Sequence, residues 1–138
     1  MEPFPTIAVQ AAGAASVLIG LGHLSFGRLF AWSPDLRRLP TVTARVFITL
    51  HVAVILVLTG LGGLTLLYAR DLSTQPGLPR ALCALLSLFW LWRLLWQVWY
   101  FRPAGITYPT HKLVLHAVLI GLFLVLTVGY AAPLVHPA

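Results

Sequence analysis

Four long apolar stretches constrain this chain more than any other feature. They cover residues 6–30, 46–68, 81–101 and 113–133. A helix needs about 20 mostly apolar residues to cross a bilayer, and each stretch meets that length. Charged residues make up only 9% of the 138 residues, whereas a soluble domain carries about a quarter. The sequence therefore predicts one integral membrane domain, residues 1–138, with four spanning helices.

The connections between these stretches indicate how the helices are arranged. All ten prolines fall in the tails, in the connections or at the last residue of a stretch, as expected if the stretches are helical. Thr43 and Thr110 are predicted to cap the second and fourth helices. Because the connections are short, we expect successive helices to pack as antiparallel neighbours. The predicted fold class is an all-α, four-helix transmembrane bundle that runs up-down-up-down.

The basic residues predict an orientation. Six of them lie near one membrane surface and two near the other, and the basic side is expected to be cytoplasmic. Both termini are then on the non-cytoplasmic side, in a membrane of the bacterial inner (cytoplasmic) type. The six are Arg28, Arg37, Arg38, Arg45, Arg102 and Lys112, and the two are Arg70 and Arg80.

The same basic residues explain the net charge of +6 without nucleic acid, because they flank apolar segments and form no basic stripe with interleaved aromatics. The single cysteine, Cys83, excludes an internal disulfide and a metal site built from cysteines alone. The expected partners are the lipid bilayer and, as open alternatives, other membrane subunits or further copies of the chain.

Each predicted helix carries one polar or small-residue seam. On the first helix, small residues that favour close helix packing share a stripe with a histidine: Gly13, Ser16, Gly20, His23 and Gly27. On the third, the seam is Trp90, Arg93, Gln97 and Tyr100. The second helix places His51 with Ala44, Leu58, Gly62 and Thr65, and the fourth aligns Lys112, His116, Thr127 and Tyr130. We expect these seams to face the interior of the bundle.

Ionisable groups from all four helices fall near one depth. At about 1.5 Å per residue, His23, His51, Arg93 and His116 all lie in the cytoplasmic half of the membrane, with no acidic residue among them. Ionisable side chains inside a membrane are costly and usually functional. A bare divalent metal beside Arg93 is disfavoured, because positive charges repel strongly at low dielectric. The cluster predicts a ligand that is neutral or anionic at its core.

Haem b and a quinone both meet this condition. For haem, His51 and His116 are the expected axial iron ligands across the bundle, with Arg93, Gln97 and Lys112 at the propionates. His23 is then an alternative ligand or a supporting donor. For a quinone, histidine and arginine donate to the ring oxygens, and Trp90 or Trp96 stacks on the ring. These residue types alone do not separate the two ligands.

The predicted function is a redox-associated membrane subunit that binds haem b or quinone, in electron transport. Two other interpretations remain open. The chain can be a non-catalytic accessory or scaffolding subunit whose polar groups only lock helix packing. It can also be a small transporter or a lipid-acting membrane enzyme in which the histidines transfer protons. Whether the protein is an enzyme is left open by its sequence.

Overall fold

The computed structural model describes residues 3–101 and 109–136, and all regular structure in these ranges is helical. Four helices are long and apolar enough to cross a membrane, which confirms the predicted all-α, four-helix transmembrane bundle. They are α1 (Phe4–Leu29), α3 (Thr41–Leu67), α5 (Leu78–Trp99) and α6 (Thr110–Val135). Two short helices, α2 (Trp32–Arg38) and α4 (Ala69–Thr74), lie in the first and second connections.

Prolines and a glycine mark the starts of the long helices. Pro3, Pro40 and Pro109 occupy the position before α1, α3 and α6, and Gly77 precedes α5 with a φ of +77°. Proline fits there because the first amides of a helix have no intrahelical acceptor. Thr110 is already helical and Thr43 lies inside α3. The two predicted threonine caps are therefore wrong.

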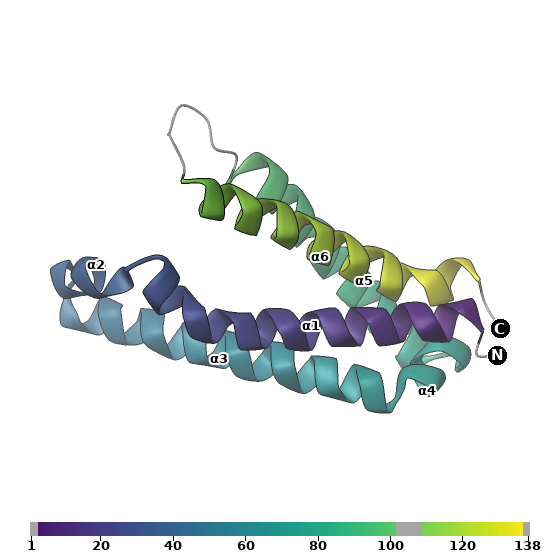
Figure 1. The fold of residues 1–138 in the computed structure, drawn as a ribbon. Coiled ribbons are helices and arrows are strands. Elements are labelled where there is room, and N and C mark those ends of the chain that lie inside the picture. The colour runs from purple at the N-terminus through teal and green to yellow at the C-terminus, as the bar shows by residue number, and fades with distance from the viewer. Residues whose placement is uncertain (1–2, 102–108, 137–138) are drawn as a thin grey trace.

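The long helices form two antiparallel hairpins, one of α1 and α3 and the other of α5 and α6. Figure 1 shows the hairpins close together where α4 and both chain termini lie, and diverging toward the end that carries α2. We call these the closed end and the open end. The open end contains the last turn of α1, all of α2, the start of α3, the end of α5 and the start of α6.

Helix α1 is the central element, because it packs against both α3 and α6. Small residues allow both approaches. A Cβ atom at Gly62 of α3 would lie 2.8 Å from the carbonyl oxygen of Gly13, and one at Gly129 of α6 would lie 2.6 Å from that of Ala8. The hydroxyl of Ser16 donates a hydrogen bond of 2.9 Å to the carbonyl of Leu58. The predicted small-residue stripe of the first helix therefore faces its neighbour.

Helices α3 and α5, although successive spans, do not pack along each other within the described residues. The expectation that all successive spans are neighbours is wrong at this point. The connection between them folds into α4, which contacts α1, α3, α5 and α6. Ser73 of α4 hydrogen-bonds to Thr6 of α1 at 2.8 Å, and the Cys83 thiol donates to the Leu72 carbonyl at 3.5 Å. Helix α4 thus separates the two spans while joining the hairpins.

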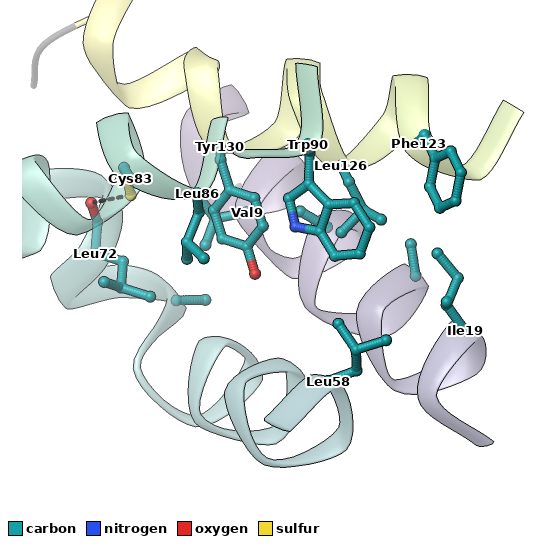
Figure 2. Packing of buried hydrophobic residues seen from close by; sticks show 13 residues of the cluster. Val9, Ile19, Leu58, Leu72, Cys83, Leu86, Trp90, Phe123, Leu126 and Tyr130 are labelled. Carbon is teal, nitrogen blue, oxygen red and sulfur yellow. Dashed lines mark hydrogen bonds between the residues drawn. The ribbon is translucent and has the colours of Figure 1, made fainter. Parts of the chain in front are cut away.

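The buried core lies toward the closed end. Figure 2 shows Tyr130 and Trp90 among aliphatic side chains from α1, α4 and α5. The Tyr130 hydroxyl hydrogen-bonds to Thr65 at 2.9 Å, so its polar atom is satisfied in the core. Tyr100, which was expected on the inward seam of the third helix, is 68% exposed. It lies at the C-terminal end of α5, beyond the region where the hairpins meet.

The orientation relative to the cytoplasm remains a prediction from the basic residues. Five of the six residues assigned to the cytoplasmic surface belong to the described part of the chain, and Arg102 lies outside it. Arg28, Arg37 and Arg38 are exposed at the open end, in the last turn of α1 and on α2. Arg70 and Arg80 are exposed at the closed end. The two sets therefore lie at opposite ends of the bundle.

Candidate functional site: a cationic cleft at the open end

A cleft of about 430 Å³ lies between the two hairpins at the open end. This volume falls within the range of small-molecule sites in proteins. One wall comes from the end of α1, the residue after it and the start of α2, and it is entirely aromatic. The other comes from α5, the segment just after it and α6, and it mixes apolar, polar and basic groups. The lining residues are Phe26, Phe30, Trp32, Arg93, Gln97, Phe101, Lys112, Leu113, Leu115, His116 and Leu119.

Arg93 is the most unusual residue of the cleft. Its guanidinium carbon lies 4.8 Å from the ring centroid of Phe123 and 5.4 Å from that of Phe101. The Nη1 atom is buried and has no hydrogen-bond partner among the described residues. A buried donor without an acceptor costs free energy, and a charged one costs more. The two cation–π contacts offset part of this cost, but they do not supply an acceptor.

No acidic side chain of the described residues lines the cleft. The chain has three acidic residues, and the two that the structure describes, Asp35 and Asp71, are exposed on α2 and α4. Asp71 accepts a hydrogen bond of 2.9 Å from Gln75 at the closed end. The positive charge of Arg93 therefore faces the cleft without a carboxylate beside it.

Gln97 and His116 join α5 to α6 beside Arg93. The amide nitrogen Nε2 of Gln97 lies 2.9 Å from Nδ1 of His116, and Gln97 is buried. Because an amide nitrogen only donates, Nδ1 is the acceptor, and the neutral imidazole carries its proton on Nε2. His116 thus has one N–H left to offer to a molecule in the cleft.

Lys112 adds a second positive charge. It lies in the first turn of α6, and its Nζ atom is 5.9 Å from the ring centroid of Phe30, the residue that follows α1. This contact spans the cleft from one hairpin to the other. Lys112 and Arg93 therefore bring two cations to one aromatic cavity.

His23 and His51 form a separate group behind the aromatic wall. The ring nitrogen Nε2 of His51 donates to the His23 carbonyl at 3.0 Å, and Nδ1 of His23 donates to the Ile19 carbonyl at 2.8 Å. Their ring centroids are 5.6 Å apart. The ring of His23 stacks on Phe26 at 4.4 Å, and His51 meets Trp32 edge-on at 4.8 Å. These histidines support two cleft residues and are not in its lining.

The residues predicted from the sequence thus fall into three places. Arg93, Gln97, Lys112 and His116 line one cleft. His23 and His51 lie together behind its wall. Trp90 is 4% exposed in the core, where its ring stacks on that of Phe123 at 5.5 Å (Figure 2). Trp90 therefore packs against the Phe123 ring, which makes the closer of the two cation–π contacts with Arg93.

Sequence reasoning missed the aromatic wall. Phe26 follows His23 by three residues, and Phe30, the residue after α1, follows Phe26 by four. This spacing keeps all three on one helical face. That spacing was the available signal. Trp32 and Phe101 carry no comparable signal, because aromatic residues at helix ends are the usual membrane-interface anchors.

The described residues contain no group of three or more His, Cys, Asp or Glu side chains placed to hold a metal ion. The predicted axial pair, His51 and His116, belongs to two different hydrogen-bonded groups. Comparison with protein-family models, curated proteins and solved structures found no match to this chain. The geometry of the cleft is therefore the basis for assigning a function.

Proposed function

We propose that this membrane protein is a redox-associated subunit that binds a quinone in the cleft at the open end. The observation that carries the proposal is the buried, unpartnered Nη1 atom of Arg93 beside an aromatic cavity. A buried cationic donor of this kind calls for an acceptor that the described residues do not provide. A ligand that enters from the membrane supplies both an apolar body and that acceptor.

The hydrogen-bonding groups of the cleft match a quinone. Arginine and lysine side chains have donors and no acceptor, and His116 offers the N–H of its Nε2 atom because Gln97 occupies Nδ1. Quinone oxygens are acceptors only. The ring would lie among Phe26, Phe30 and Trp32, where aromatic rings favour offset stacking or edge contacts.

The arrangement is less suited to haem b. An axial histidine binds iron through a nitrogen lone pair, and the other ring nitrogen usually donates a hydrogen bond. In His116 the nitrogen engaged with Gln97 is an acceptor, so the free nitrogen carries the proton. Iron ligation through that nitrogen would require the Gln97 amide to turn over. His51 in turn lies behind Trp32 and not in the cleft lining.

The test is direct binding of a soluble quinone to the purified protein in lipid nanodiscs. We expect calorimetry with 2-methyl-1,4-naphthoquinone to show one site per chain. Arg93→Gln should weaken binding by about tenfold or more, because a charged hydrogen bond to the ligand is lost. Arg70→Gln is the matched control, since Arg70 is exposed at the closed end, and it should bind like the unmodified protein.

Two results would contradict the proposal. One is the absence of any quinone binding by the unmodified protein. The other is a Soret absorption band in the purified protein that disappears in both His51→Ala and His116→Ala, because this would identify haem at the predicted axial pair.

A further inference from the structure

The two cations of the cleft indicate the charge of its ligand. This inference rests on the proposed function. Arg93 and Lys112 line the same cavity, and no acidic side chain of the described residues lines it with them. We infer that the ligand is bound as an anion. Its class is an aromatic ring compound with an ionised oxygen, such as a hydroxyquinone or an ionised quinol, which the cleft binds in preference to a neutral quinone.

The environment of Arg93 supports this inference. A neutral carbonyl can accept a hydrogen bond from Nη1, but it leaves the positive charge uncompensated in a region lined by Phe101 and Phe123. An ionised oxygen supplies both the acceptor and the countercharge. Hydrogen bonds in which the donor or the acceptor is ionised are shorter and about twice as strong as neutral ones, and an ionised acceptor adds the attraction between opposite charges, which is strong at low dielectric. Arginine is also suited to this pairing because its charge persists under all ordinary conditions.

The aromatic wall beside Lys112 and Arg93 indicates that the anion is attached to a ring. Lys112 belongs to α6, and its Nζ atom lies 5.9 Å from the centroid of the Phe30 ring on the opposite wall. Arg93 lies on α5 against Phe123, which is only 3% exposed. The space between these cations is bordered by the aromatic wall of Phe26, Phe30 and Trp32. A flat ring in this space can direct its oxygens toward the basic side while its faces meet aromatic carbon.

A matched pair of ligands tests the charge. The two compounds are 2-hydroxy-1,4-naphthoquinone, whose acidic hydroxyl is ionised at neutral pH, and 2-methyl-1,4-naphthoquinone, which has the same rings and no charge. Both are titrated by calorimetry into the protein in nanodiscs of zwitterionic phosphatidylcholine. We expect the ionised compound to bind at least about tenfold more tightly, because its negative charge is attracted to Arg93 and Lys112 in addition to the hydrogen bonds that both compounds can accept.

Variants identify which group provides the preference. Arg93→Gln should reduce the affinity ratio of the two compounds toward one, whereas Arg93→Lys, which keeps the charge, should retain part of it. Lys112→Gln should reduce the ratio less, since Lys112 lies in the first turn of α6, nearer to the membrane surface. Arg70→Gln should leave the ratio unchanged. Each variant is compared with the unmodified protein by circular dichroism, so that a folding defect is recognised.

The outcomes separate the two proposals. Equal affinity for the two compounds, or tighter binding of the neutral one, overturns the inferred charge and leaves quinone binding intact. Failure of both compounds to bind overturns quinone binding itself. A last comparison, in phosphatidylglycerol nanodiscs, is made at high ionic strength, which screens repulsion between an anionic bilayer and the ionised compound. If these nanodiscs then abolish binding of the ionised compound while the neutral one still binds, the countercharge comes from a lipid head group, and the inference is again overturned.

Discussion

Single residues in this protein differ sharply in how well their polar atoms are satisfied. At the closed end, buried hydroxyl groups are paired, as in the contacts of Thr6 with Ser73 and of Thr65 with Tyr130. At the open end, Arg93 has a buried nitrogen atom without a partner among the described residues. Because unsatisfied buried groups are rare in folded proteins, the contrast distinguishes a packed half from a half in which a cation beside a cleft is left without an acceptor among the described residues.

The pairing of Thr65 and Tyr130 yields a prediction at this scale. Thr65 is 3% exposed and Tyr130 is 1% exposed, and their oxygens are 2.9 Å apart. Hydrogen bonds between membrane helices contribute about 0.6 kcal/mol on average and at most about 1.7 kcal/mol. We expect a double-mutant cycle of Thr65→Val and Tyr130→Phe to give a coupling energy in this range, measured by unfolding in mixed micelles. A coupling energy of zero would show that the contact does not stabilise the fold.

At the scale of the helices, backbone approach at a few glycines holds α1 between its two neighbours. A Cβ atom at Gly62 would lie 2.8 Å from both the carbonyl oxygen of Gly13 and the backbone nitrogen of Val17. Real Cβ atoms do not come so close to backbone atoms, so the helices would have to move apart. Gly60 and Gly63 are different, because a Cβ atom at either position meets no atom within 4 Å.

These glycines give a second prediction, with controls in the same helix. Gly62→Ala should destabilise the protein by about 1–3 kcal/mol, the usual cost of overpacking a close interface. Gly60→Ala should be neutral or stabilising by up to about 1 kcal/mol, because alanine favours helix where space allows. Equilibrium unfolding in micelles compares the variants. Equal effects at the two positions would contradict the close approach of α1 and α3.

The helices were more predictable than their arrangement. Apolar length and the spacing of small residues are local properties of the sequence, so the four spans and the α1 stripe containing Gly13 and Gly20 followed from it. The separation of α3 from α5 did not follow, because it depends on α4 folding and packing in the second connection. Depth in the membrane placed His51 and His116 at one level, but depth does not determine which groups meet around the bundle axis.

The candidate site was partly predictable, because the residues of one helix that share a face can be identified from their spacing. Arg93 and Gln97 lie four residues apart on one helical face, so their common position was readable from spacing. Lys112 and His116 are related in the same way. The aromatic wall comes from the opposite hairpin, and the sequence contains no pattern that assigns Phe30 to a cleft with Lys112. Phe30 and Lys112 belong to different hairpins and lie on opposite sides of the cleft, 5.9 Å apart from ring centroid to Nζ. The cleft itself exists because the two hairpins diverge at the open end.

The whole molecule is asymmetric along the membrane normal, with a tightly packed closed end and a cleft at the open end. The basic residues predict that the open end faces the cytoplasm, and chemical labelling from each side of the membrane tests this. Native Cys83 is 0% exposed, so it should remain unmodified by a membrane-impermeant maleimide in folded protein and serve as an internal control.

Two exposed positions then report the sidedness. His111 lies at the start of α6 at the open end, and Thr74 lies at the end of α4 at the closed end. We expect His111→Cys to react only in inside-out vesicles and Thr74→Cys only in right-side-out vesicles or intact cells, as judged by a mass shift of the protein. The reverse pattern would place the cleft on the outer side, and the six basic residues would then be an exception to the rule that basic residues gather on the cytoplasmic side. Reaction of Cys83 in the unmodified protein would instead show that the closed end opens, because a 0% exposed thiol cannot meet a polar reagent without separation of α4 from α5.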